Sequence, residues 1–543
     1  MKSIRYYLKK SKMSYVKFNI LALLIVSVSF SGCSDLKETP YTFIDPGNYY
    51  KTSDELESAL TSVYSDFRSI AGNYTTLMAL ELVTEHAMPA HLSKDGVRTF
   101  NCWQGVNQST TYNIQIWDEG YQLINRCNVV LGRGDGVNVT DEERSHIYGQ
   151  ARFFRAYMMY VLLRLYGGLA IPESYTAGLS GLDIPRKTVD ETYDYIISDL
   201  KYCIDNLPTR SQWGSGAYFR ASKGAAQALL GDVYLTRGCM EDYNTSYFQE
   251  AKKYLGDVIS SGEYELLPNY KSLWYWFVEE ASKNTKESLL EVQYGTTQLS
   301  NLHCYFGIMT SDRNLGSRMF ARAGLSHKDY ASFQDTDVRK QCFLTEYTIY
   351  GTTTRRYFQP EYKGFSGKGE GKWPSTSPGN VKFYDRSESA YESNGDTRCS
   401  KANYIVMRYS DVLLNYAEVE NYLNGPTSDA YAKLNAVHNR SNSNPIATGL
   451  TKQGFDDALF QERVWEQIGE SHLYFDELRT NRLGKNVYEY KMYMYENGYY
   501  NCDKLQFVPQ RSFLWKIPQT SLDSNPALEQ NPDNVSDPKY PLN

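Results

Sequence analysis

Apolar side chains recur at three- and four-residue intervals through most of the chain, a pattern typical of amphipathic helices. In the segment 53–72, Ser53 is the expected N-cap, and one apolar face is formed by Leu56, Leu60, Val63 and Phe67. Further helices are expected at 114–134, 140–166 and 188–207. Thr140 precedes an acidic first turn, and Gly167 follows the last periodic residue, so both ends of the third helix are marked.

Two stretches have the spacing of helix-pair repeats. "AAQALLGDVYLTRG" (225–238) matches the first helix of a tetratricopeptide unit, with small residues where a second helix approaches closely. Ala251 and Leu255 stand at the spacing expected of that second helix. A related pair is "SDVLLNYAEVENYLNG" followed by "SDAYAKLNAVHNRS". Paired helices of this kind predict a stacked, superhelical scaffold.

The hydrophobic pattern and the composition change between about 281 and 400. Here "KESLLEVQYGTT" alternates apolar and polar residues like a strand, and Gly, Ser, Thr and Asn become frequent. The stretch from 488 to the end is also expected to be loop. We therefore predict a mainly α fold of tetratricopeptide-like helix pairs, an α/α superhelix, with a loop-rich subdomain containing a few short strands. The scaffold is assigned to 47–270 and 402–483, and the ligand-side subdomain to 271–401 and 484–543.

The N-terminal segment reads as an export signal. Six basic residues and no acidic one precede an apolar run from 20 to 30, which is shorter than the roughly 20 residues that cross a bilayer. Ser31 and Gly32 suit cleavage, after which Cys33 would begin the mature chain with a thiol available for acylation. We expect a lipoprotein signal peptide at 1–32 and a tether at 33–46; an ordinary secretory signal with a chance Cys is the alternative.

The net charge and the spacing of the cysteines exclude some classes of partner and binding site. Removal of residues 1–32 changes the formal net charge from −6 to about −12, and the rest has no basic block, so nucleic acid is not expected as a partner. Eight Cys besides Cys33 are scattered without C-x-x-C or a His at metal-ligand spacing, so we expect no metal and no cofactor. The 48 Tyr suggest a protein that binds ligands at a wet surface.

Several stretches, in order along the chain, resemble the SusD/RagB family of outer-membrane lipoproteins. They are "SGCSD", "ARFFRAYMMYVLLRLYGGLAIP", "FRASKGAAQALLGDVYLTRG", "YIVMRYSDVLLNYAEVEN" and "LWKIPQTSLDSNPALEQNP". The resemblance implies a helical-repeat fold anchored through Cys33 and exposed at the cell surface. It also implies a function: capture of oligosaccharides as the lid of a TonB-dependent, SusC-like transporter. In some members of the family the cargo is a peptide.

The resemblance places ligand contacts in two segments, which we call the first segment (84–104) and the second segment (300–316). Both carry flat rings beside hydrogen-bonding groups, which suits the apolar faces and hydroxyl rims of sugars. The candidates are His86, His91, Trp103, His303, Tyr305, Phe306, Arg313 and, further on, Trp373. Gly316 stands about where the starch-binding member has a Trp, which argues against starch; neutral glycans are the first expectation.

The sequence supports other functions less well than glycan binding. The sequence holds no G-x-S-x-G, no H-E-x-x-H and no Gly-rich phosphate loop, so no catalytic residues are assigned. A surface glycoside hydrolase would need two carboxylates, but Glu470, Asp476 and Glu477 fit a solvated or ion-paired helix face better. An oligopeptide-binding lipoprotein of the RagB type stays open. "YEYKMYMYENGYY" (488–500) is expected to be a loop that packs on the scaffold.

Overall fold

Helices make up most of the part of the chain that the structure describes. The computed structural model describes residues 50–89, 107–176, 183–295, 323–348, 355–358, 372–375, 378–385, 400–442, 444–496 and 513–532. The longer helices are α2 (Ser53–Ala71), α3 (Tyr74–Leu82), α5 (Thr111–Arg133), α6 (Asp141–Tyr166), α7 (Val189–Asn206), α9 (Lys223–Met240), α10 (Thr245–Ser260), α15 (Tyr409–Asn424), α16 (Ser428–Ser441), α17 (Lys452–Gln467) and α19 (Leu483–Glu496). The predicted mainly α fold is confirmed.

Shorter elements connect these helices. They are α8 (Arg210–Trp213), α11 (Tyr275–Val278), α13 (His327–Ser332), α18 (Leu473–Arg479), α20 (Gln519–Ser524), and the 3₁₀ turns η1 (Gly134–Gly136), η2 (Ser215–Ala217), η3 (Tyr270–Leu273), η4 (Glu279–Ser282) and η6 (Val338–Cys342). The strands are β1 (Ala87–Pro89), β2 (Ser288–Val292), β3 (Ala323–Leu325), β4 (Phe343–Leu344), β5 (Glu346–Thr348), β6 (Arg355–Phe358), β7 (Lys372–Ser375), β8 (Gly379–Asn380) and β9 (Tyr404–Arg408).

The helix starts follow from local side-chain chemistry. Thr140 is the N-cap of α6, as the sequence predicts: its hydroxyl accepts a hydrogen bond from the Glu143 amide, and the Glu143 carboxylate accepts one from the Thr140 amide. The first helix begins one residue earlier than expected, because Thr52 rather than Ser53 is the N-cap and pairs with Glu55. These reciprocal bonds satisfy amides that the first helical turn leaves without partners.

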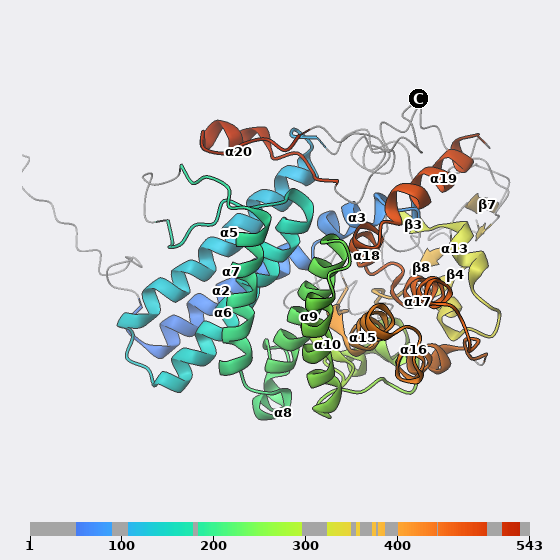
Figure 1. Ribbon diagram of the computed structural model, residues 1–543, viewed down its shortest axis with the longest axis horizontal. Coiled ribbons are helices and arrows are strands. Elements are labelled where there is room, and N and C mark those ends of the chain that lie inside the picture. Colours follow the sequence, from blue (N-terminus) through green and yellow to red (C-terminus); the bar gives the residue numbers. More distant parts are fainter. Residues whose placement is uncertain are drawn as a thin grey trace, which may run out of the picture. The chain divides into compact units, whose positions relative to one another are not determined.

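Successive helices pack against one another as an array. Neighbours in space are α2, α5, α6, α7, α9, α10, α15 and α16 in that order, and α17 packs on α15 (Figure 1). α9 and α10 approach closely at Gly231, where a Cβ atom would lie 2.6 Å from Leu255 Cγ. At Gly238 a Cβ atom would lie 2.6 Å from Phe248. The glycine spacing of the sequence therefore corresponds to a real close approach of two helices.

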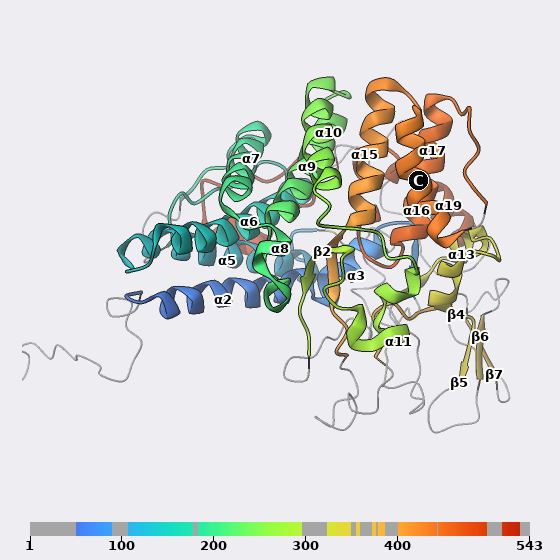
Figure 2. The ribbon, with the colours of Figure 1, turned by 90° about the horizontal axis from the view of Figure 1, so that it is seen from below.

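The strands form small separate sheets at the sides of the helices. β2 pairs with β9, β1 with β3 and β4 with β8, all antiparallel, while β5, β6 and β7 form a three-stranded sheet. Figure 2 shows β4 to β7 beside α13, at the end of the array that holds α16 and α17. The expectation that the chain is loop from 488 onward is wrong for its first part, because α19 continues to Glu496.

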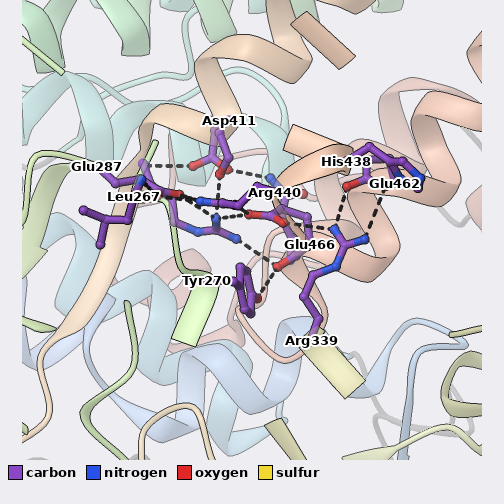
Figure 3. A network of polar contacts seen from close by, with 12 residues as sticks. Leu267, Tyr270, Glu287, Arg339, Asp411, His438, Arg440, Glu462 and Glu466 are labelled. Atoms are coloured by element: carbon purple, nitrogen blue, oxygen red, sulfur yellow. Dashed lines mark hydrogen bonds and ion pairs between the residues drawn. The ribbon is translucent and has the colours of Figure 1, made fainter. Parts of the chain in front are cut away.

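A buried ion network joins the loop-rich part of the chain to the helices (Figure 3). Glu466 on α17 is fully buried and accepts hydrogen bonds from Arg339, Arg408 and Arg440. Burial alone would raise the pKa of Glu466, but these three guanidiniums hold it well below its usual range. The carboxylate is therefore ionised in the folded protein.

The network is extended by further carboxylates on both sides. Arg339 Nη1 donates to Glu462 at 2.5 Å, and Arg440 Nη1 donates to Glu287 at 2.6 Å. Arg339 belongs to η6, Glu287 directly precedes β2, and Glu462 lies on α17. The segments around residues 287, 339, 408, 440 and 462–466 are thus tied into one interior, and residues 52–543 form one compact unit. The assigned boundaries at 270, 401 and 483 stay a prediction.

Replacement of Glu466 by Gln should destabilise the protein strongly. The substitution keeps the shape but leaves three buried guanidiniums with one anion fewer, so we expect the free energy of unfolding to fall by about 3 kcal/mol or more. Urea unfolding followed by circular dichroism measures this. Glu265→Gln is the matched control, because Glu265 and Lys286 form an exposed pair whose loss should cost under about 1 kcal/mol. Equal losses in the two variants would contradict the role given to the network.

Candidate functional site

Part of the first segment pairs with a strand that follows the second segment in sequence. β1 lies within the first segment, and β3 begins seven residues after the end of the second one. They pair antiparallel, with Pro89 opposite Ala323, and the amide of Ser326 donates to the carbonyl of His86 at 2.9 Å. The pairing brings together two parts of the chain that are far apart in sequence.

Described residues beyond the other end of each segment contact the scaffold. Asn113 on α5 donates to the carbonyl of Asn107 at 3.0 Å and to that of Lys516 at 2.8 Å. Tyr294 donates its hydroxyl to the carbonyl of Gly72, at the end of α2, at 3.0 Å. Loops with rigid supports at both ends are common carriers of binding residues.

Most of the expected contact residues lie outside the described residues. These are His91, Trp103, His303, Tyr305, Phe306 and Arg313. Trp373 lies on β7, opposite Arg356 of β6 in the parallel pair, and its side chain is also outside the description. Tyr384, further on in the same region, is fully buried against Trp276 and is not available for stacking. The assignment of the two segments to a ligand therefore stays a prediction.

His86 is described, and its placement corrects the expectation of a surface contact. Its residue exposure is 2%, and Nδ1 lies 3.1 Å from Asp329 Oδ2. Nε2 lies 3.7 Å from Glu477 Oε1 on α18. The ring thus joins the start of β1 to α13 and α18 and supports the first segment from beneath.

The surroundings of His86 are charged and buried. Burial by itself would lower the pKa of His86, but the carboxylates of Asp329, Glu85 and Glu477 outweigh that effect and raise it to about 10. Burial raises the pKa of Glu477 well above its usual range, and the neighbouring Glu85 adds to the rise. Burial lowers the pKa of Lys491, on α19, to about 7. The cluster around His86 therefore favours a positive charge at the ring.

Sequence reasoning missed Asp329 and Glu477 as parts of this cluster. Neither stands at a recognisable spacing from His86, because His86 directly precedes β1 while Asp329 lies on α13 and Glu477 on α18. Of the other carboxylates singled out, Glu470 pairs with Arg408 at 2.9 Å and Asp476 with Arg479 at 2.6 Å. The ion-paired alternative is confirmed for these two, while the solvated one is wrong, because both are buried.

A cavity of about 130 Å³ lies between α2, α6, α9, α15 and α18. Polar side chains contribute to its lining, among them Arg164, Asp232, Asp411, His472 and Arg479. Ligand pockets are typically about 300–1,000 Å³, so this cavity is too small for an oligosaccharide. A larger cavity, of about 450 Å³, is lined by Tyr243, Phe248 and Tyr422 among others. The assignment of a glycan to the first and second segments stays a prediction.

Within the described part of the chain, no helix combines the length and the apolar character needed to cross a bilayer.

Comparison with known families gives two matches that together span most of the chain. The model described as "SusD family" matches residues 280–533, and the model described as "Starch-binding associating with outer membrane" matches residues 45–235. SusD-like protein P2 of Formosa agariphila is 26% identical and covers 96% of this chain and 99% of its own length.

Solved structures show the same fold. A SusD homolog from Bacteroides thetaiotaomicron superposes with a TM-score of 0.72 at 23% identity, covering 89% of this chain and 98% of that one. Surface glycan-binding protein A from the same organism, solved in complex with laminarihexaose, gives a TM-score of 0.68 at 18% identity, with 89% and 100% covered. The helical array with its small sheets is therefore an established fold.

Proposed function

The chain belongs to the SusD/RagB family, and on that premise we propose that it captures oligosaccharides at the cell surface and delivers them to a TonB-dependent, SusC-like transporter, acting as its lid. The observation that carries the site assignment is the pairing of β1 with β3. β1 belongs to the first segment and β3 begins seven residues after the second one, which supports the proposal that residues of both segments contact one ligand. A relative of the same fold binds laminarihexaose, which supports a glycan as the ligand.

The chain is a binding protein rather than an enzyme, in agreement with its family. Sugar binding needs only stacked rings and hydrogen bonds. Covering about 50 Å² of apolar sugar surface at ~25 cal/mol/Å² gives roughly 1 kcal/mol per stacked face. A few such contacts give weak, reversible capture, which suits a protein that must release its cargo. The glycoside hydrolase alternative is therefore not retained.

The first expected result is glycan binding without turnover. A glycan array with neutral α- and β-glucans should show retention of some ligands, and chromatography of the same mixtures should show no smaller products. Peptides that co-purify with the chain, seen by mass spectrometry together with an array without binding, would instead favour the oligopeptide-binding alternative.

The site itself is tested with the identified glycan. Trp103→Ala and Tyr305→Ala should each weaken binding by about 2 kcal/mol, about 30-fold, if each ring is a central stacking platform. Isothermal titration calorimetry measures the affinity. Val189→Ala is the control, because Val189 is an exposed apolar residue at the start of α7, outside both segments. Wild-type affinity in both folded site variants would overturn the assignment.

We expect the mature chain to begin with an acylated Cys33. Mass spectrometry of the N-terminal peptide should show the lipid, and Cys33→Ala should move the protein from the membrane to the soluble fraction. Substitution of Cys342, which is fully buried, serves as a thiol control that should leave the protein in the membrane. A mature N-terminus at another residue would contradict the prediction.

The transporter is the expected partner. Affinity purification of the chain from detergent-solubilised outer membrane should recover a TonB-dependent transporter in a stable complex, identified by mass spectrometry. Recovery of the lipoprotein alone, from membranes in which such a transporter is detected, would count against the lid role.

A further inference from the structure

We propose that Glu85, His86 and Glu477 form a binding site for one divalent metal ion of the zinc type, beneath the first segment. One ligand atom from each of these buried residues lies within 4.8 Å of the others. The inference goes beyond glycan capture, because it concerns an ion that would hold the root of the first segment in place.

The atoms that face one another in this cluster are poorly satisfied. Among the described residues, no group other than these three pairs with Nε2 of His86, Oε2 of Glu85 or Oε2 of Glu477, and the two carboxyls lie close enough to share a proton, whose place a metal ion would take. The three residues are 2%, 2% and 0% exposed. A buried polar atom without a partner costs about 1–3 kcal/mol, so three of them that face only one another call for a further group.

The kind of donor indicates the kind of ion. A ring nitrogen with two carboxylates suits zinc, which takes His nitrogen and Glu oxygen at about 2.0–2.2 Å. Two such ligands in a tetrahedral site lie roughly 3.4 Å apart, so small side-chain rotations from the present separations would close the site. Calcium and magnesium prefer ligand sets of oxygen alone.

His86 is oriented as metal-binding histidines are. Its second nitrogen, Nδ1, lies 3.1 Å from Asp329 Oδ2, and a carboxylate in that position fixes the tautomer and directs Nε2 at the ion. Asp329 is itself held by the hydroxyl of Ser326, which donates to it at 2.6 Å. Ser326 is the N-cap of α13, so the support is part of a helix start.

A zinc ion would take the place of the proton on Nε2 of His86, because a ligating imidazole is neutral, so the charges around the cluster leave room for a cation. Lys328 Nζ lies 3.3 Å from Oε1 of Glu85, which leaves Oε2 of the same carboxylate directed elsewhere. Lys491 donates to the carbonyl of Leu82 at 2.8 Å. Glu477 accepts from Asn486 through Oε1, so its Oε2 is also left for an ion.

The consequence is mechanical. Glu85 and His86 directly precede β1, while Glu477 lies on α18, which packs against α3 and α19. An ion shared by the three would pin the start of the first segment to the scaffold. The sequence predicted no metal, since Glu477 is remote from His86 in the chain and ligand spacing could not show the cluster.

The test uses the full-length chain, purified in detergent without a histidine tag and stripped with a chelator. After incubation with ZnCl₂ and gel filtration, elemental analysis should find one zinc per chain, and thermal unfolding should shift upward. Cobalt(II) should give the visible absorption of a tetrahedral site with a nitrogen ligand. Magnesium and calcium should cause no shift. A wild-type chain that retains no zinc would overturn the proposal.

Variants locate the ion. Glu477→Gln and Glu85→Gln should each weaken zinc binding at least 10-fold, and Asp329→Asn should weaken it about 10- to 100-fold through the orientation of His86. Glu265→Gln, in an exposed ion pair, should bind as wild type does. Circular dichroism checks that each variant folds. The zinc content and the cobalt spectrum of the wild-type chain test the proposal even if a variant does not fold. Undiminished zinc in both folded glutamate variants would place the ion elsewhere. None of these measurements involves a glycan, so their outcome is independent of the proposed function.

Discussion

Neutralisation of buried charge is the constraint on which much of this structure depends. Glu466 carries the interactions of three arginines, each brought by a different segment of the chain. A guanidinium without its carboxylate inside a protein is strongly unfavourable, so none of these segments can be buried alone without penalty. The segments around η6, β2, β9 and α17 therefore gain from burial together. The interior of the repeat array and that of the irregular part are in this sense one interior.

The described residues beside the candidate binding region have a polar cluster of their own, separate from this ion network. β9 leads from the ion network into α15, while β1 and β3 stand at the roots of the two segments. The polar cluster beneath β1 connects the same root to α13 and α18 through His86. Different residues thus support the backbone and contact the ligand. Buried charges position the backbone, whereas the rings that we expect to contact the ligand lie further along the sequence of the segments.

The sequence predicted the parts of the fold that depend on local chemistry. Periodic apolar residues, a Thr cap and a terminal Gly mark α6 within the chain itself, and the glycines of α9 encode its contact with α10. Prediction from the sequence failed where the position of a residue depends on partners that are remote in the chain. His86 reads as a loop residue until Asp329 and Glu477 are brought to it by folding. The tyrosine-rich stretch after 488 reads as loop because its composition hides a helix with Tyr490 buried and Tyr493 exposed.

The shared root at β1 and β3 has a consequence for how such a protein can diversify. When both ends of a segment are fixed, doubling its length adds only about 0.6 kcal/mol of closure entropy, so insertions and deletions between the fixed ends are nearly neutral for stability. Segments taken from relatives could be exchanged between Pro89 and Asn107, or between Tyr294 and Ala323, without redesign of the interior. The scaffold would then stay constant, while ligand preference evolves by replacement of whole segments.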